Sequence, residues 1–230
     1  MGNGMMLELS HINLATADRV LLTNFNAQVA PGEVLALMGP SGCGKSSLLS
    51  FIAGTLSAPF KASGQLRLQG RELAQLPTMQ RRVGMLFQDD LLFPHMTVQD
   101  NLLFALPANG TRAQRVLQAE AALRSADLAG LGGRWPATLS GGQRARVSVL
   151  RALLAQPQAL LLDEPFSRLD AALRERFRSF VFERLRNLNI PAVLVTHDAQ
   201  DVPAHAQLRL WPSEPSEPSD SGDLSEAGHA

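Results

Sequence analysis

The sequence contains no tyrosine, only one cysteine, and no excess of charge of either sign. A lone cysteine, Cys43, excludes an internal disulfide and is typical of a reducing compartment. Because 21 basic residues balance 21 acidic ones, no general electrostatic field attracts the chain to nucleic acid or to anionic lipid. We therefore expect no nucleic-acid partner, and we expect any membrane association to occur through another protein.

Long apolar runs are absent as well. No stretch approaches the ~20 apolar residues that span a bilayer, and residues 1–6 lack the basic-then-apolar pattern of an export signal. We expect a chain that neither crosses the membrane nor is exported. Its 230 residues, 45% of them hydrophobic, suffice for one large or two small domains that fold in water.

The segment from Gly39 to Ser46 reads GPSGCGKS, which matches the nucleotide-phosphate loop in its glycines, lysine and hydroxyl. The apolar run from Val34 to Met38 predicts a buried parallel strand before it, and residues 46–53 predict a helix that ends at Gly54. Backbone N–H groups of such a loop and the positive end of the helix dipole bind phosphate oxygens. The pattern therefore predicts a nucleoside triphosphate site.

Within this site, Lys45 is expected to reach the β- and γ-phosphates and Ser46 to ligate Mg²⁺. An incidental lysine in a glycine-rich turn is the alternative, and the strand and helix on either side argue against it. The residues expected to contact the nucleotide here are Gly39, Pro40, Ser41, Gly42, Cys43, Gly44, Lys45, Ser46 and Ser47.

Strand-like and helical patterns around the loop predict an α/β fold with a mostly parallel core sheet, an N-terminal antiparallel β-layer and an inserted helical subdomain at about residues 89–155. The predicted strands are residues 7–9, 19–22, 34–38, 65–68, 83–87, 159–163 and 192–196. The predicted helices are residues 46–53, 113–129, 147–155 and 171–188. From Pro212 onward, apolar residues are too few to bury, so residues 213–230 are predicted to be a disordered tail.

Several further segments are weak signals alone but fit one family when taken in order. They are Gln88 after its strand, LSGGQ at 139–143, LLLDEP at 160–165, SRLD at 167–170 and THD at 196–198. With the phosphate loop they resemble the ATP-binding cassette (ABC) family of transporter ATPases over about residues 7–211. Residues 87–98 and 143–147 are similar to bacterial importer ATPases in particular. The resemblance implies a RecA-like P-loop NTPase core, with residues 1–212 forming the cassette.

Three side chains, Glu164, His197 and Gln88, are candidates for catalysis, and Asp163 is a candidate metal ligand beside them. Asp163 ends a strand at the edge where ligands of open α/β sheets bind, so it is expected to hold Mg²⁺ beside Ser46. The next residue, Glu164, is the candidate catalytic base. Gln88 is expected to coordinate the metal and contact the attacking water. His197 is expected to hold the γ-phosphate and Glu164, the alternative being a strand-end histidine that faces solvent.

A second anion site is expected where a helix opens at the residues Ser140, Gly141, Gly142 and Gln143. One nucleotide does not need two such loops from one chain. The resemblance implies that this loop contacts the ATP of a partner subunit in a head-to-tail homodimer. Asp170, in the loop after Glu164, is also expected to contact the nucleotide.

The resulting expectation is an ATPase that uses ATP and Mg²⁺, dimerises on ATP and drives solute import through separate integral membrane permease subunits, together with a solute-binding protein. It would act at the cytoplasmic face of the inner membrane. The alternatives are an exporter ATPase and a soluble cassette ATPase acting on DNA or ribosomes. A single compact cassette without a basic patch argues against the latter.

Two local features stay open. Residues 13–19 lie where the family usually carries an aromatic residue that stacks on adenine, and they contain none, so the contact to the base is undecided between residues such as Leu14 and Arg19. At the position of Arg168, the family more commonly carries a small residue. The apolar side chains of Leu91, Leu92, Phe93 and Met96 form a candidate docking surface for the permease, or else pack the core of the insertion.

Overall fold

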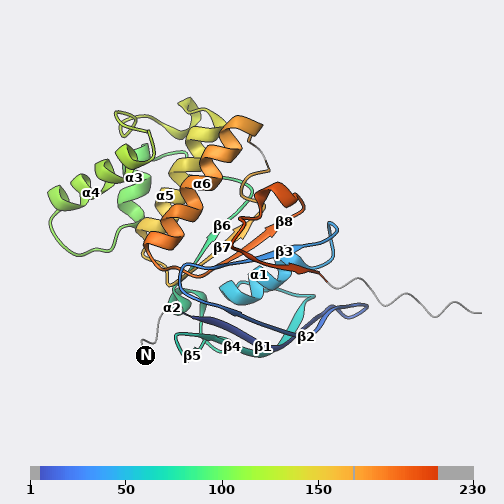
Figure 1. Cartoon of the computed structure of the whole chain (residues 1–230). Helices are drawn as coiled ribbons and strands as arrows, with labels where there is room; N and C mark the ends of the chain where they lie inside the picture. Colours follow the sequence, from blue (N-terminus) through green and yellow to red (C-terminus); the bar gives the residue numbers. More distant parts are fainter. Residues whose placement is uncertain (1–5, 168, 212–230) are drawn as a thin grey trace, which may run out of the picture.

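The computed structural model describes residues 6–167 and 169–211 (Figure 1). The predicted tail at 213–230 and Arg168 lie outside the described residues. Two sheets and a group of helices make up the fold, which confirms the predicted α/β class with its mostly parallel core sheet and antiparallel β-layer. The division of the chain into a cassette over 1–212 and a tail stays a prediction.

An antiparallel sheet in the order β2-β1-β4-β5 forms the first layer. Its strands are β1 (Leu7–Ala15), β2 (Val20–Val29), β4 (Lys61–Leu68) and β5 (Arg71–Glu72). In β1, Leu7 and Leu9 are buried, but beyond them the buried positions are Ile12 and Leu14. The pairing with β2 shifts register between Leu9 and Ile12, where His11 has a φ of 52°. This bulge reverses the alternation, which is why the sequence pattern predicted a strand of only three residues, 7–9.

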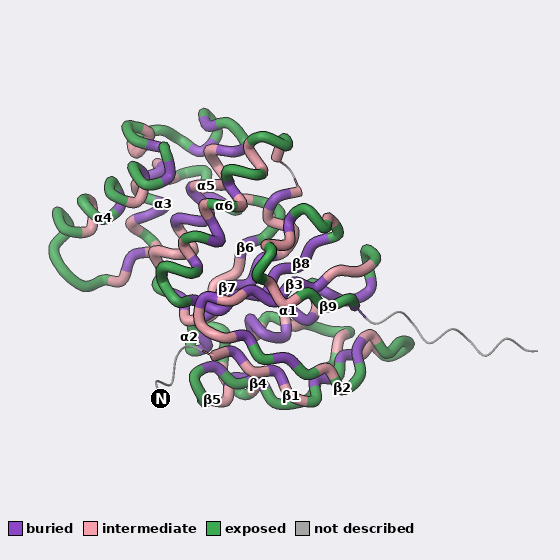
Figure 2. The backbone as a smooth tube through the Cα atoms, in the orientation of Figure 1, coloured by how far each residue is buried: buried purple, intermediate pink, exposed green. Residues whose placement is uncertain are grey.

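The second sheet is entirely parallel, in the order β6-β7-β8-β3-β9. Its strands are β3 (Val34–Met38), β6 (Val83–Leu86), β7 (Ala159–Asp163), β8 (Ala192–Thr196) and β9 (Gln207–Leu210). The central strands β3, β7 and β8 are buried along nearly their whole length (Figure 2). Their continuous apolar sequences are typical of strands with both faces covered. The edge strand β9 was not predicted, and its Leu208 and Leu210 are exposed.

Helices cover both faces of the parallel sheet. The helix α1 (Lys45–Ala53) lies between the two sheets, and its Leu48 and Ile52 share a core with Leu161 of β7 (Figure 1). On the opposite face, α6 (Ala171–Asn187) packs Phe177 in one core with Leu160 of β7. Period-two alternation along each strand thus sends neighbouring residues into different cores.

Between β6 and β7, the chain forms α3 (Val98–Ala105), α4 (Arg112–Ser125) and α5 (Gly141–Leu154), which share a third apolar core that includes Leu102, Leu123 and Val147. Thr97, Thr111 and Ser140 cap their N-termini. The helix predicted at 113–129 ends at residue 125, and the one predicted at 147–155 begins at residue 141 because Ser140 caps it. Shorter helical segments are α2 (Thr78–Arg81), η1 (Pro136–Thr138) and η2 (Ala199–Asp201). No helix among residues 6–167 and 169–211 combines the length and apolarity that crossing a bilayer requires.

A buried arginine closes the C-terminal end of α1. The guanidinium of Arg81, which is 6% exposed, donates through Nη1 to the carbonyl oxygens of Phe51 at 2.6 Å and Ile52 at 3.1 Å. Its Nη2 and Nε donate to the carbonyls of Ala74 at 2.9 Å and Leu76 at 2.8 Å. A positive charge at the C-terminus of a helix satisfies its last carbonyls and complements its dipole.

We therefore expect Arg81→Met to lower the free energy of unfolding by about 2 kcal/mol, because buried carbonyl oxygens lose their donors. Urea denaturation followed by circular dichroism measures the change. The exposed neighbour Arg82 provides the matched control, as Arg82→Met removes the same charge without uncovering those carbonyls. Equal losses in the two variants would contradict the capping role.

Candidate nucleotide site

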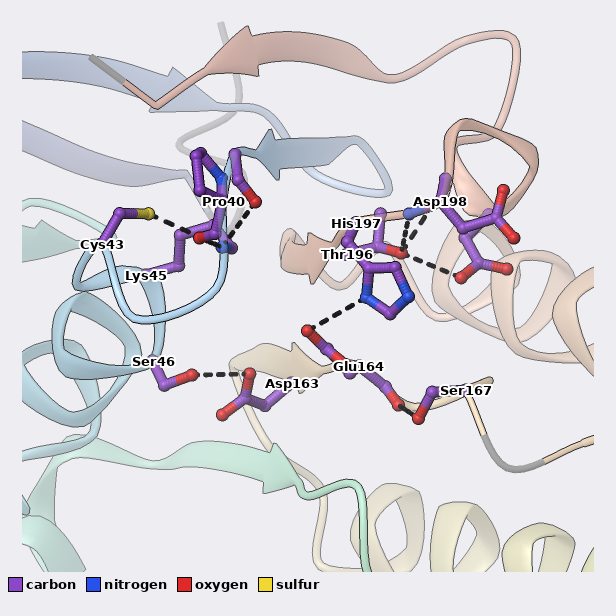
Figure 3. Close-up of polar contacts among 12 residues, drawn as sticks. Pro40, Cys43, Lys45, Ser46, Asp163, Glu164, Ser167, Thr196, His197 and Asp198 are labelled. Carbon is purple, nitrogen blue, oxygen red and sulfur yellow. Dashed lines mark hydrogen bonds and ion pairs between the residues drawn. The ribbon is translucent and has the colours of Figure 1, made fainter. Parts of the chain in front are cut away.

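The phosphate loop connects the end of β3 to the start of α1, as the sequence predicts (Figure 3). Lys45 is 5% exposed, and its ammonium donates to the carbonyl oxygens of Gly39 at 2.8 Å and Pro40 at 2.6 Å. The Cys43 sulfur lies 3.6 Å away. The loop thus curves around the lysine. At the N-terminus of α1 the capping position is Gly44, which has no side chain to satisfy the first N–H groups, so these can bind an anion.

The loop also depends on a side chain that the sequence reading did not single out. Trp211, 4% exposed, follows β9, and its Nε1 donates to the Leu21 carbonyl at 3.2 Å. A Cβ added at Gly39 would lie 2.6 Å from the Cβ of Trp211, and Gly44 has a φ of 109°. Both glycines are therefore required by the backbone and its close neighbours. An aromatic residue at the end of the last apolar segment was the only available signal for this role.

Ser46, the last residue of the loop, contacts Asp163 at the end of β7: the Ser46 hydroxyl donates to Oδ1 of Asp163 at 3.0 Å (Figure 3). Burial raises the pKa of Asp163, the hydrogen bond from Ser46 lowers it, and the Glu164 charge raises it further. A hydroxyl and a carboxylate are ligands that suit Mg²⁺. Within the described part of the chain, no group of three or more His, Cys, Asp or Glu side chains could hold a metal alone. Any Mg²⁺ here would therefore complete its coordination with water and phosphate oxygens.

Glu164 and His197 form the second pair, with Nδ1 of His197 at 3.2 Å from Oε1 of Glu164 (Figure 3). Glu164 has a φ of 46°, in the left-handed region that is costly for a non-glycine residue. Backbone hydrogen bonds hold it there: its N–H donates to the Val195 carbonyl at 3.0 Å, and its carbonyl accepts from Ser167 Oγ at 2.9 Å and from the Ser167 N–H at 3.3 Å. Strained backbone of this kind is often found at functional sites.

Gln88 follows β6 at the same sheet edge, since Leu86 of β6 pairs with Leu162 of β7. It lines a cavity of about 280 Å³ between the end of β6, α5 and Pro165, together with Gly141 and Arg144. In the part of the chain that the structure describes, no hydrogen bond joins Gln88 to Asp163 or Glu164, so its role as a metal ligand stays a prediction. The structure does bring it beside the Ser140–Gln143 segment.

That segment forms a reciprocal capping box at the start of α5. Ser140 Oγ accepts from the Gln143 N–H at 3.3 Å, and Gln143 Oε1 accepts from the Ser140 N–H at 2.9 Å. A side chain at Gly142 would require Leu173 of α6 to move, since an added Cβ would overlap Leu173 Cδ2. Asp170 caps α6 by accepting from the Leu173 N–H at 2.9 Å. Nucleotide contacts by these residues stay predictions.

The candidate docking surface of Leu91, Leu92, Phe93 and Met96 is only partly exposed. Leu92 is 7% exposed and packs in the core of α3, α4 and α5. For this residue the alternative, packing of the insertion's core, is therefore correct. Leu91 is 53% exposed. Phe93 stacks edge-on against Phe104, with ring centroids 4.9 Å apart, and Phe104 is itself 65% exposed. Leu91 and Phe104 are thus exposed, and Phe93 and Met96, which are partly buried, complete the remaining candidate docking surface.

A family model described as ABC transporter matches residues 22–167. The chain therefore belongs to the ABC transporter ATP-binding family, whose members are P-loop NTPases that hydrolyse ATP. This confirms the family resemblance of the motifs.

Among individual relatives, the chain is 53% identical over 203 residues to the uncharacterized ABC transporter ATP-binding protein YnjD of Escherichia coli K12, covering 88% of this chain and 94% of that protein. This identity confirms that the chain resembles the ATPase of the Ynj-type bacterial transporter. The Fe(3+) ions import ATP-binding protein FbpC of Brucella abortus strain 2308 is 45% identical over 181 residues, 78% of this chain and 50% of its own length.

The sulfate/thiosulfate import ATP-binding protein CysA of Gloeobacter violaceus is 40% identical over 198 residues, which are 86% of this chain and 57% of CysA. The chain thus spans about half the length of these two import proteins. The similarity to importer ATPases favours import over the export and non-transport alternatives.

We expect Glu164→Gln to lower the rate of ATP turnover at least about 100-fold while ATP binding persists, because the amide keeps the shape of the side chain and cannot accept a proton. Phosphate release and binding of a fluorescent ATP analogue measure the two properties. Glu175→Gln, on the exposed surface of α6, is the matched control. Wild-type turnover in Glu164→Gln would refute the assignment.

The raised pKa of Asp163 generates a second prediction, on stability. The folded state disfavours the charged carboxylate, so Asp163→Asn should raise the melting temperature at pH values above the raised pKa, where the wild-type carboxyl is charged. The gain should shrink as the pH falls through the raised pKa toward the usual value of 3.8, because the wild-type carboxyl becomes neutral. Thermal unfolding of both proteins at pH 7.5 and pH 5 tests it. A gain that grew in acid would contradict the burial effect.

Proposed function

We propose that the chain is the ATP-hydrolysing subunit of a bacterial importer, which binds ATP with Mg²⁺ and acts as a head-to-tail homodimer on separate permease subunits. The observation that carries the proposal is the pairing of Glu164 with His197 at 3.2 Å, next to the Ser46–Asp163 contact at 3.0 Å and the phosphate loop. A base, a residue that orients it, a metal site and a phosphate cradle thus lie at one edge of the parallel sheet.

Each residue then has a role in phosphoryl transfer to water. Lys45 exchanges the carbonyl oxygens of Gly39 and Pro40 for β- and γ-phosphate oxygens, which are stronger partners for an ammonium group. Ser46 and Asp163 would hold Mg²⁺, which would neutralise charge on the phosphates. Glu164 takes the proton of the attacking water, and His197 holds Glu164 in line with the γ-phosphate.

The second half of the site comes from a partner copy. Ser140 starts α5 with its side chain bound to the Gln143 N–H, so the backbone N–H groups of Gly141 and Gly142 are the ones available to an anion. A helix N-terminus in this position supports binding of the γ-phosphate held by another subunit. Hydrolysis removes the group that both loops contact, and the halves separate.

Transport would be driven through the patch of Leu91, Phe93, Met96 and Phe104, on which an apolar segment of a permease can dock. The chain would thereby lie at the cytoplasmic face of the inner membrane, held by its permease, and a solute-binding protein would deliver the solute. The printed substrates of the import relatives differ, Fe(3+) for FbpC and sulfate or thiosulfate for CysA. The solute meets the permease, so its identity is not written in the nucleotide site.

Composite sites predict complementation between two inactive variants. Mixing Ser140→Arg chains with Lys45→Ala chains produces heterodimers with one doubly altered and one intact site, so about a quarter of all sites should be intact after random pairing. We expect hydrolysis to recover to that order in the mixture, whereas each variant alone stays inactive.

The same pair in a Glu164→Gln background serves as the control for subunit cooperation, because retention of one ATP per heterodimer needs no turnover. Sizing chromatography with labelled ATP measures it. Heterodimers that form but neither hydrolyse nor retain ATP would refute the shared site.

A further inference from the structure

A buried ion pair lies directly behind the loop that carries His197. Asp201 is 1% exposed and accepts hydrogen bonds from Nε and Nη2 of Arg174 at 2.8 Å and 2.7 Å. The Thr196 hydroxyl, at the end of β8, donates to the same carboxylate at 2.9 Å. Such a bidentate pair has a defined geometry, since both partners are planar and rigid. The position of Asp201 is therefore determined by α6, which carries Arg174.

Arg174 also reaches past this pair to the residue after His197. Its Nη1 lies 2.8 Å from Oδ2 of Asp198. The backbone N–H of Asp198 donates to the Thr196 hydroxyl at 3.1 Å (Figure 3). Both chain neighbours of His197 are thus bound to one network. The contact with Asp198 is not needed to satisfy the buried carboxylate of Asp201. It does restrict the turn from which the imidazole projects.

The imidazole itself is weakly held by comparison. Its side chain is 56% exposed, and its contact with Glu164 at 3.2 Å is the interaction that gives it a direction. An exposed side chain rotates freely unless its backbone and its partners restrict it. The direction of His197 therefore depends on the backbone of residues 196–198, which Arg174 determines from behind.

The same arginine lies one turn from the start of α6. The backbone N–H of Arg174 donates to the carbonyl of Asp170, the residue that caps this helix. Asp170 in turn follows the loop that begins at Glu164. A shift of the helix start would therefore move Arg174 and, through it, the turn of His197.

We propose that Arg174 and Asp201 are positioning residues for ATP hydrolysis, which hold the turn of residues 196–198 so that His197 points at Glu164. The inference rests on the proposed role of His197. Arg174 itself contacts neither the nucleotide nor the attacking water, and it affects hydrolysis only through the position of His197. The start of α6 at Asp170 and the catalytic histidine are thereby connected through one side chain.

The test compares Arg174→Lys with wild type, because lysine keeps the charge beside the buried Asp201 but loses the planar fork. We expect kcat to fall about tenfold with ATP affinity changed less than twofold, since the phosphate loop is not disturbed. Asp201→Asn, which keeps the shape, is the second variant and should lower kcat in the same way. Arg176→Lys, on the exposed side of α6, is the matched control and should hydrolyse ATP like wild type.

A double-mutant cycle separates positioning from general stability. If Arg174 acts through His197, Arg174→Lys should lower the rate by less than about twofold in a His197→Ala background. Single-turnover measurements with labelled ATP give these rates even when they are slow. A loss of the same size in both backgrounds would overturn the inference and leave the proposed function intact. Full activity of His197→Ala would overturn both.

Imidazole signals in ¹H–¹⁵N NMR provide a readout that does not need activity. The His197 signal is assigned by its disappearance in His197→Ala. It should shift in Arg174→Lys and stay in place in Arg176→Lys. An unchanged His197 signal in Arg174→Lys would overturn the inference whatever the rates, because the turn would then not depend on the arginine.

Discussion

The parallel register of β7 and β8 is the constraint on which the rest of the site depends. Asp163, the last residue of β7, lies opposite Val195 of β8, so the residues that follow each strand leave the sheet at the same edge. The backbone bond from the Glu164 N–H to the Val195 carbonyl extends this register by one step. Carboxyl ends of parallel strands collect polar groups in this way because helices cover both faces of the sheet and leave that edge open.

The site accepts unfavourable local features that the surrounding cores offset. Burial disfavours the charge of Asp163, Glu164 has a left-handed backbone, and Lys45 is enclosed by its own loop. Apolar cores on both faces of the parallel sheet, one around α1 and one under α6, hold the strands rigid enough to maintain these features. Rigid support of this kind is what keeps catalytic groups in a productive geometry.

Much of the fold followed from local patterns. Continuous apolar runs predicted β3, β7 and β8, and the phosphate-loop spacing predicted α1, since these features depend only on residues close in the chain. Predictions failed where a contact between segments distant in the chain determined the local structure. The β1 strand continues past its pattern because a bulge at His11 reverses its faces, and β9 forms because β3 offers an open edge to a short segment with exposed leucines. For Leu92 the sequence left surface and core open, and packing between α3, α4 and α5 places it in the core.

By itself, the sequence determined the chemistry of the site: a lysine, a serine, two carboxylates and a histidine at spacings that suit phosphoryl transfer, in the order of one family. Only the tertiary structure decided which of them meet. Ser46 and Asp163 are 117 residues apart in the chain and touch because α1 packs beside β7. Trp211 behind the phosphate loop and Arg174 behind His197 carried no motif, because their roles arise from packing between distant segments, which no local pattern encodes.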